Sequence, residues 1–292
     1  MTTTYYFRVA DFYISVSLPN ACDIEKLLPS FRPFAVSGCN GAKPLLELSA
    51  VSSGSMPNVG GGELIEESDN DMGHLVLYRL ADGYYIEIFN KGSRHSMYAT
   101  SDFSSVEVCV QWDDSHAGGA LSSLIRVAYA QAILSHAAVS IHASAVFHGG
   151  MAYLFMGKSG TGKSTHSSLW IKNIAGTELL NDDNPTIRII DGKAYAYGTP
   201  WSGKTPCYKN MSFPISGMVR LRQASHNIFH RQDGVDAFIA VYPGCSVIVS
   251  DYMLRNMLYD TLAALAEIVN VGIMECLPDS DAALTCYESL TD

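Results

Sequence analysis

The sequence predicts an α/β domain over residues 113–292, preceded by a β-rich domain over residues 1–112. Three observations lead to this fold class. The chain has 292 residues, which is the length of two domains at ~150 residues each. Short runs of aromatic and β-branched residues fill its first part, whereas apolar strands alternate with helical patterns after residue 139. Between these parts, apolar residues at three-and-four spacing predict a long helix over 119–136.

Short alternating segments predict the strands of the first domain. Ala81-Asp82-Gly83 separates two of them, and Asp-Gly between alternating runs is a hairpin signal. The stretch 52–73 contains three consecutive glycines and several acids, so we expect a loop or a disordered insert there. The expected strands are 5–18, 74–80, 84–89, 93–98 and 105–110.

The second domain shows strands and helices in alternation. Gly149-Gly150 separates the first two apolar strands, and Asp191-Gly192 marks a second hairpin. Strands are expected at 139–147, 151–156, 177–180, 186–190, 193–197, 217–221, 246–249 and 271–277, and helices at 163–173, 252–269 and 280–290.

Composition excludes several classes of protein. The net charge is 19 − 29 = −10, and 48% of the residues are hydrophobic. This is too apolar for a disordered chain and too acidic for a general nucleic-acid binder. The longest apolar stretches fall short of the ~20 residues that cross a bilayer. No signal peptide is visible, and seven scattered cysteines indicate a reduced, cytoplasmic protein. A homo-oligomer is left open.

A glycine-rich loop is the most specific motif. It matches G-x-x-x-x-G-K-[ST] in full, an apolar strand enters it, and a helix leaves it. Its backbone N–H groups form a nest for phosphate oxygens, its lysine reaches the outer phosphates, and its serine hydroxyl is a natural Mg²⁺ ligand. The alternative is a turn that merely links strand to helix. The residues are Gly157, Lys158, Ser159, Gly160, Thr161, Gly162, Lys163, Ser164 and Thr165.

Asp182 and Asp183 form the candidate acid pair. They follow an apolar strand, and the chain between Lys163 and Asp182 has room for only one helix and one return strand. The loop and the pair should therefore lie side by side, at the strand ends where open α/β sheets bind ligands. One carboxylate would bind Mg²⁺ and the other would act as a base toward a hydroxyl; which does which is open. Alternatively, the segment 181–185 is an ordinary turn, because its residues are of the types that favour turns.

Further candidates lie on either side of these motifs. His142 precedes the strand that enters the loop and is a candidate charge neutraliser or proton carrier, or else a core histidine. Lys204, in a Gly/Pro-rich loop, is positioned to meet a transferring phosphate or an acidic substrate, or is an ordinary exposed lysine. Of Arg220 and Arg222, one is expected to point into the site and the other into solvent.

The segment 140–142, the loop and the acid pair together resemble the catalytic domain of bacterial HPr kinase/phosphorylase and, more distantly, ATP-dependent phosphoenolpyruvate carboxykinase. The resemblance covers about residues 135–290. It implies that Lys163 and Ser164 hold phosphates and Mg²⁺, and that Asp182 or Asp183 deprotonates a serine-like hydroxyl near His142. The chain lacks an E-x-R-G-x-G segment, which serves the phosphorylase reaction in that family.

These features predict an ATP- and Mg²⁺-dependent kinase that acts on a hydroxyl of a protein, peptide or small molecule, by in-line phosphoryl transfer. Asp182, Asp183, His142, Lys163 and Lys204 are its expected catalytic residues, and Ser164, Asp182 and Asp183 its expected metal ligands. Two alternatives are a carboxykinase-like lyase that makes phosphoenolpyruvate, and a nucleotide-binding sensor without catalysis. The acceptor is not readable from the sequence.

Overall fold

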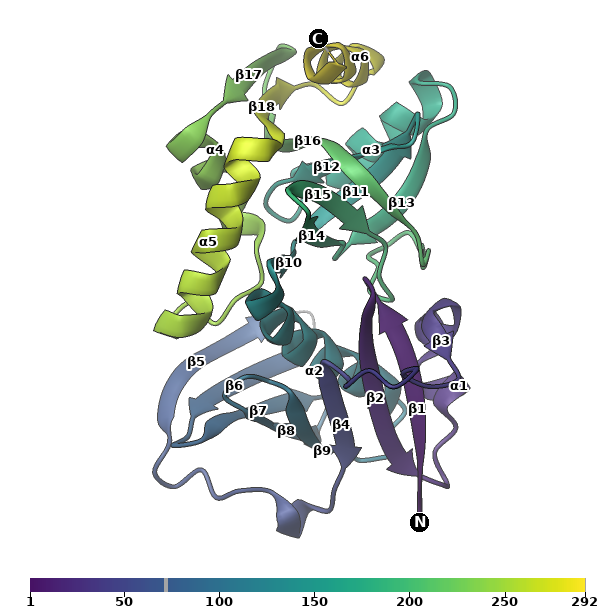
Figure 1. Cartoon of the computed structure of the whole chain (residues 1–292), viewed down its shortest axis with the longest axis vertical. Helices are drawn as coiled ribbons and strands as arrows, with labels where there is room; N and C mark the ends of the chain where they lie inside the picture. Colours follow the sequence, from purple (N-terminus) through teal and green to yellow (C-terminus); the bar gives the residue numbers. More distant parts are fainter. Residues whose placement is uncertain (71–72, 292) are drawn as a thin grey trace. The chain divides into compact units, whose positions relative to one another are not determined.

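The structure, a computed structural model, describes residues 1–70 and 73–291 (Figure 1). It divides into two compact units, Met1–Ala132 and Ile133–Asp292. Each unit contains a large β-sheet and helices, so the chain is a mixed α/β protein.

The first unit is built on a sheet with the strand order β3-β1-β2-β4-β9-β8-β7-β6-β5. Its hairpin β6–β7 turns at the predicted Asp-Gly. The strands are β1 Thr2–Val9, β2 Phe12–Pro19, β3 Ala35–Val36, β4 Leu46–Ala50, β5 Glu63–Asn70, β6 Gly73–Arg79, β7 Gly83–Asn90, β8 Ser93–Thr100 and β9 Ser105–Cys109. The helices are α1 Ile24–Leu27 and α2 Ala117–Ala132, with 3₁₀ turns at Pro29–Phe34 and Ser53–Ser55.

Several features of this sheet differ from the sequence prediction, and the strands β3 and β4 were not expected at all. The segment 5–18 is interrupted by a turn at Ala10 and Asp11, whose φ angles are 47° and 64°. The stretch 52–73 was expected to be a loop, but Glu63–Asn70 forms β5, paired with β6. Residues 71 and 72 of that stretch lie outside the described residues. Because β5 is an edge strand, its acidic side chains discourage pairing of the sheet edge with another chain. The same acidic residues made the segment look like a loop in the sequence.

Helix α2 belongs to the first unit, because it packs on β4, β8, β9 and α1. The two units therefore meet at Ala132 and Ile133, well after the expected boundary at 112. The predicted helix 119–136 is an α-helix to Ala132, followed by a 3₁₀ turn, Ile133–His136.

The segment Ala117–His136 shows that the expectation about the length of apolar stretches was wrong. It is long and apolar enough to cross a membrane by length and composition, although no stretch of that kind was expected. The segment was not recognised in the sequence because many of its residues are alanine, glycine or serine. These small residues keep its mean hydropathy only just high enough for a membrane span. In the structure, 61% of its apolar window is buried, as in the core helix of a soluble protein.

The second unit is built on a sheet with the strand order β10-β14-β15-β16-β12-β11-β13, and β18 joins it by pairing with β16 and β17. The strands are β10 Ala138–Ser140, β11 Ala143–His148, β12 Met151–Met156, β13 Glu178–Asp183, β14 Thr186–Ile190, β15 Lys193–Tyr197, β16 Ser212–Gln223, β17 Ile228–Gln232 and β18 Asn270–Cys276. The helices are α3 Lys163–Asn173, α4 Gly234–Val241, α5 Tyr252–Ile268 and α6 Ser280–Thr291, with a 3₁₀ turn at Tyr242–Gly244.

The second unit also departs from the prediction in places. The expected strand 139–147 is two strands, because the chain changes partners at Ile141: β10 pairs with β14, whereas β11 pairs with β12 and β13. The segment 246–249 is not a strand; its apolar residues lie in the connection before α5. Helix α4 and strand β17 were not predicted; they are short, with eight and five residues.

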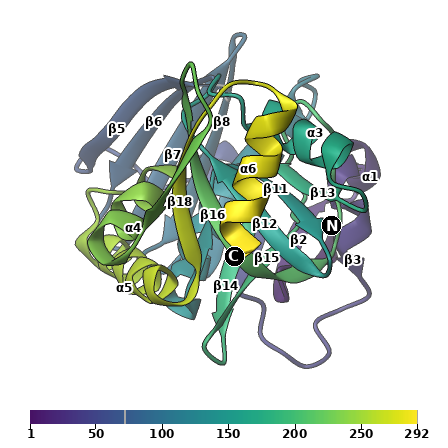
Figure 2. The same cartoon turned by 90° about the horizontal axis from the view of Figure 1, so that it is seen from above.

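Helices cover both faces of this second sheet (Figure 2). Val219 and Leu221 of β16 join a buried cluster with Trp170 of α3 and residues of α6. Arg220, between them, reaches Ala240 of α4 instead. Because successive strand residues point to opposite faces, α3 and α6 cover one face and α4 covers the other.

His166 in that core makes stability depend on pH. It is buried, its Nε2 accepts a hydrogen bond from Trp170 Nε1 at 3.1 Å, and burial lowers its pKa to about 4. The unfolded chain binds a proton near pH 6.5, so the unfolded state binds more protons as the pH falls below that value. The stability is therefore present above pH ~6.5 and is lost toward pH ~4, by about 3 kcal/mol.

This pH dependence can be isolated by measuring the free energy of unfolding from pH 4 to pH 7 for the wild type and for His166→Gln. Glutamine keeps a hydrogen-bond acceptor and does not titrate, so we expect the pH curve of the variant to be flatter. Parallel curves for the two proteins would contradict a neutral, buried His166.

Candidate functional site

The glycine-rich loop joins the end of β12 to the start of α3. Gly160 and Gly162 have φ angles of 79° and 109°, in the left-handed region that glycine adopts without strain. Gly162 is the N-cap of α3, and the residues of the first turn, Ser164 and Thr165, are exposed. The N–H groups of a first helical turn have no partner within the helix and favour an anion. The backbone of this loop is thus suited to bind one.

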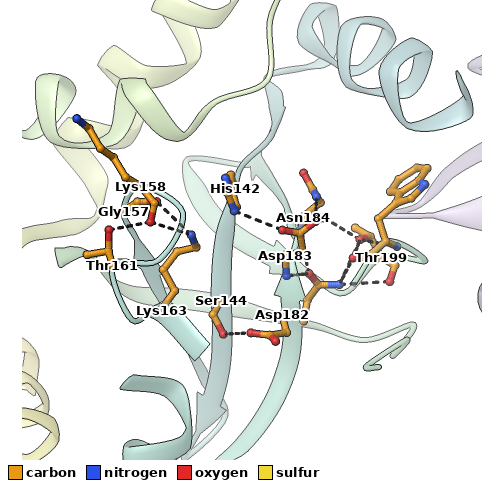
Figure 3. Close-up of polar contacts among 12 residues, drawn as sticks. His142, Ser144, Gly157, Lys158, Thr161, Lys163, Asp182, Asp183, Asn184 and Thr199 are labelled. Atoms are coloured by element: carbon orange, nitrogen blue, oxygen red, sulfur yellow. Dashed lines mark hydrogen bonds and ion pairs between the residues drawn. The ribbon is translucent and has the colours of Figure 1, made fainter. Parts of the chain in front are cut away.

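Lys163 is folded back on its own loop (Figure 3). Its Nζ donates to the carbonyl oxygens of Gly157 at 3.1 Å and Lys158 at 3.5 Å. Burial lowers the pKa of the ammonium group, and the negative charges of Asp183 and Asp182 partly offset this effect. The amine of Lys163 therefore lies within the field of both carboxylates.

Asp182 and Asp183 are the last two residues of β13, whereas the sequence suggested that they follow the strand. Strand β13 lies antiparallel beside β11, with Ser144 opposite Asp182 and Ala143 opposite Asp183. Because successive residues of a strand point to opposite faces, the two carboxylates have different surroundings. Figure 3 shows Asp183 directed toward His142 and Asp182 toward Ser144.

Asp182 is held by a buried pair of serines. Its side chain is 5% exposed, and Oδ1 accepts a hydrogen bond from Ser144 Oγ at 2.8 Å. Ser144 Oγ lies 2.6 Å from Ser167 Oγ, so Ser167 donates to Ser144 while Ser144 donates to Asp182. Oδ2 of Asp182 is buried and has no hydrogen-bond partner among the described residues. One oxygen of a buried carboxylate is thus available to a ligand that enters the site.

Asp183 is more accessible and lies beside a histidine. Its Oδ1 is 3.4 Å from His142 Nε2, and the two side chains are 24% and 45% exposed. Asn184 Nδ2 donates to Asp183 Oδ2. The His142 N–H donates to the Gly244 carbonyl at 2.7 Å, which fixes the backbone where the chain leaves β10. His142 and Asp183 therefore form a partly exposed acid–imidazole pair.

The Asn181 side chain holds the end of β13 in place through hydrogen bonds. It is fully buried, and its Oδ1 accepts from the N–H groups of Asp183 at 3.0 Å and Asn184 at 2.9 Å. Its Nδ2 donates to the Trp201 carbonyl at 3.0 Å and to Thr199 Oγ1 at 3.2 Å. Thr199 Oγ1 in turn donates to the Asn184 carbonyl at 2.7 Å. This network holds the acid pair in a single backbone conformation.

The loop that carries Lys204 crosses β13 at the acid pair. The Gly203 N–H donates to the Asp182 carbonyl at 3.1 Å. A Cβ atom at Gly203 would lie 2.6 Å from that oxygen, so only glycine permits the contact. The Lys204 side chain is exposed and has no hydrogen bond or ion pair with the part of the chain that the structure describes. The chain thus passes close to the pair, but this lysine is not engaged.

The structure brings most of the predicted site residues together. Lys163, His142, Asp182 and Asp183 lie around one edge of the sheet, and Ser164 is the second residue of α3. Ser144, Ser167 and Asn181 were given no role by the sequence. Ser144 had one available signal: it is a polar residue in an apolar strand, two positions after His142.

Replacing Ser144 with alanine should destabilise the protein by about 1–3 kcal/mol, because a buried carboxylate then loses its hydrogen-bond donor. Denaturant unfolding would measure this. Ser168→Ala, on an exposed serine of α3, is the control and should change stability by less than ~0.5 kcal/mol. In the Asp182→Asn background, the cost of Ser144→Ala should shrink. An equal cost in both backgrounds would show that the two side chains are not coupled.

No protein-family model matches the chain, and no curated protein matches it. Among solved structures, it is similar to the Hpr(Ser) kinase/phosphatase from Coxiella burnetii, with a TM-score of 0.30 and 13% identity. The match covers 52% of this chain and 93% of that one. The strand order of its two large sheets makes the chain a mixed α/β protein independently of that similarity.

Proposed function

We propose that the protein is an ATP-dependent phosphotransferase that transfers the γ-phosphate to a hydroxyl of a protein, peptide or small molecule. One observation carries this proposal: a glycine-rich loop with a lysine at the start of α3 lies beside two carboxylates in different surroundings. Phosphoryl transfer needs a phosphate cradle, cations and a base near the nucleophile, and these residues supply each of them.

The loop 157–165 would bind the phosphates. Its N–H groups and the first turn of α3 favour negative charge. When phosphates arrive, Lys163 would exchange the carbonyls of Gly157 and Lys158 for phosphate oxygens. The exchange replaces two neutral acceptors with charged ones, and hydrogen bonds between charged groups are stronger.

The oxygen donors near the loop fit Mg²⁺, which prefers carboxylate, hydroxyl, phosphate and water ligands. Asp182 has a buried oxygen without a partner among the described residues, and we assign it and Ser164 to the metal. Within the part of the chain that the structure describes, no group of three or more His, Cys, Asp or Glu side chains could hold a metal ion, so phosphates and water would complete the shell, as is usual for Mg²⁺. When bound, Mg²⁺ supplies charge neutralisation.

We assign the role of base to Asp183. It is the more exposed carboxylate of the pair, and His142 stands next to it. Asp183 would accept the proton of the acceptor hydroxyl, and the imidazole of His142 would orient the carboxylate or pass the proton on. Lys204 remains a predicted additional cation, because its loop is tied to the backbone of Asp182.

The nucleoside would occupy a cavity of about 360 Å³ beside the loop. Its walls include Leu169, Leu221, Leu277 and Pro278, together with Gly160–Gly162. An apolar slot next to a phosphate nest suits a planar base. Ala224→Trp, which fills this cavity, should weaken ATP binding by about tenfold or more and leave pyrophosphate binding unchanged. Calorimetry with both ligands measures this; an equal loss for both would place the base elsewhere.

Nucleotide turnover tests the function itself. Purified protein is incubated with γ-labelled ATP, Mg²⁺ and a panel of hydroxyl compounds and seryl peptides. We expect label on a hydroxyl and one ADP per transferred phosphate. Binding of ATP without transfer to any acceptor would instead indicate a nucleotide-binding module. Nucleotide turnover that depends on oxaloacetate would indicate a lyase.

We expect this reaction in the cytoplasm, where ATP and Mg²⁺ are available. All seven cysteines are free thiols, which fits a reducing compartment. A measurement of mass in solution would show whether the protein is a homo-oligomer.

A further inference from the structure

Arg220, near the end of β16, is a charged side chain with few partners. It is half-buried, and its Nε donates to the Ala240 carbonyl in the last turn of α4. Nη2 is buried and has no hydrogen-bond partner among the described residues. No other hydrogen bond of this guanidinium is made within residues 1–70 and 73–291. A guanidinium has five N–H donors, and the two on Nη2 are buried without an acceptor in the part of the chain that the structure describes.

No anion balances the charge of Arg220 either. It forms no ion pair with a described carboxylate, and burial lowers its pKa. The neighbouring group that would favour its charge is the thiol of Cys245, but burial raises the pKa of that thiol to about 12. Cys245 is therefore neutral at physiological pH, and Arg222 adds a second positive charge nearby. A partly buried cation without a counter-ion is costly.

Arg220 borders a cavity of about 460 Å³ next to the glycine-rich loop. Gly157–Thr161 and Arg220–Gln223 line this cavity, and no carboxylate is among them. Arg220 stands opposite Met156, the residue before the loop, in the parallel pairing of β12 with β16. The positive charge of Arg220 also lowers the pKa of Lys163. The chain has a net charge of −10, so a cavity whose charged lining residues, Lys158, Arg220 and Arg222, are all cations is a local feature.

The other arginine near this cavity is different. Arg222 is 57% exposed and lies 3.9 Å from a carboxylate oxygen of Glu275. It points into solvent and has an acidic neighbour, as expected for one of the two arginines. Arg220 is therefore the one that faces the site.

We propose that Arg220 binds an oxyanion of the phosphate class in this cavity. An oxyanion would supply both the missing acceptors and the missing charge, because a guanidinium fork binds such groups through two parallel hydrogen bonds. The proposal deepens the proposed function and rests on it for the identity of the anion. The anion is either a terminal phosphate of the nucleotide or an anionic group of the acceptor.

Calorimetry on Arg220→Met, Arg220→Lys and the control Arg231→Met tests this, with inorganic phosphate, pyrophosphate and a non-hydrolysable ATP analogue as probes. Arg220→Met should weaken phosphate or pyrophosphate binding by about tenfold or more. Arg220→Lys, which keeps the charge but loses the fork, should lie between Arg220→Met and the wild type. Arg231 is exposed on β17 and lines neither cavity, so Arg231→Met should leave these affinities within about threefold.

The probes also separate the two sources of the anion. If Arg220→Met weakens the ATP analogue as well, and phosphate does not bind beside the analogue, Arg220 contacts the nucleotide. If phosphate binds to the analogue-saturated wild type and is lost only in Arg220→Met, Arg220 belongs to the acceptor subsite.

A folded Arg220→Met variant with unchanged affinity for all three probes would overturn the proposal. If that variant also had a lower melting temperature, Arg220 would have only a structural role, at the end of α4. If Arg220→Met does not fold, unchanged binding in Arg220→Lys overturns it equally. Failure of the proposed function is distinguishable: the wild type would then bind phosphate through Arg220 but transfer no phosphate from ATP.

Discussion

Turnover should fall by about 10²–10⁴-fold when Asp183 is replaced by asparagine, which corresponds to roughly 3–5 kcal/mol of barrier. Asparagine keeps the size of the side chain and removes its charge and basicity. Asp183 is partly exposed and lies 3.4 Å from His142, so it is the carboxylate of the pair that an incoming hydroxyl can reach. Loss of the Asp183 carboxylate should remove the proton acceptor and leave the phosphate-binding loop intact.

Single-turnover rates and the affinity for Mg²⁺–ATP, measured on the same preparations, separate these effects. Asp183→Asn should bind ATP nearly as the wild type does. Asp182→Asn should instead raise the Mg²⁺ concentration needed for half-maximal rate, because the buried oxygen is lost. Asp191→Asn, in the exposed β14–β15 turn, is the matched control. If Asp183→Asn retains the wild-type rate, the base lies elsewhere.

Replacing Lys163 with alanine should weaken ATP binding by about ten- to 150-fold, because each hydrogen bond to a charged group contributes roughly 1.5–3 kcal/mol. Lys163 is the only loop residue whose ammonium group lies within the loop, on the carbonyls of Gly157 and Lys158. These carbonyls can be solvated once the amine is removed. The fold should therefore survive the substitution.

Lys158→Ala is the control for charge, because the Lys158 side chain is exposed and makes no hydrogen bond or ion pair with the described residues. Its affinity for ATP should stay within about threefold of the wild type. Calorimetry and a melting curve for each variant complete the test. Unchanged ATP affinity in Lys163→Ala, with an unchanged melting temperature, would remove the loop from the phosphate site.

Local signals predicted much of the fold. Asp-Gly and Gly-Gly pairs identify the hairpins because they supply the positive φ angles that tight turns require; Asp191 and Gly192 have φ angles of 50° and 72°. Apolar periodicity located α5 and α6 nearly to their ends, because one face of each helix is buried. The glycine-rich loop was recognisable from its residue spacing, and the structure places it between β12 and α3 as predicted.

Features that depend on distant partners were not predicted. Strand β5 is acidic and forms only because β6 is available to pair with it. The role of Ser144 depends on Asp182 and Ser167, which lie far along the chain. The sequence leaves Arg220 and Arg222 equivalent, and only the placement of Ala240 and Glu275 separates them.

The position of Lys163 has a consequence for how the proposed reaction would repeat. Its ammonium group has the carbonyls of Gly157 and Lys158 as acceptors, and the left-handed φ angles of the loop fall on glycines. In the proposed reaction, the departure of a product nucleotide would thus leave this cation with acceptors and would require no refolding of the loop. The pace of successive cycles would then be set by release and chemistry rather than by rebuilding of the phosphate-binding loop.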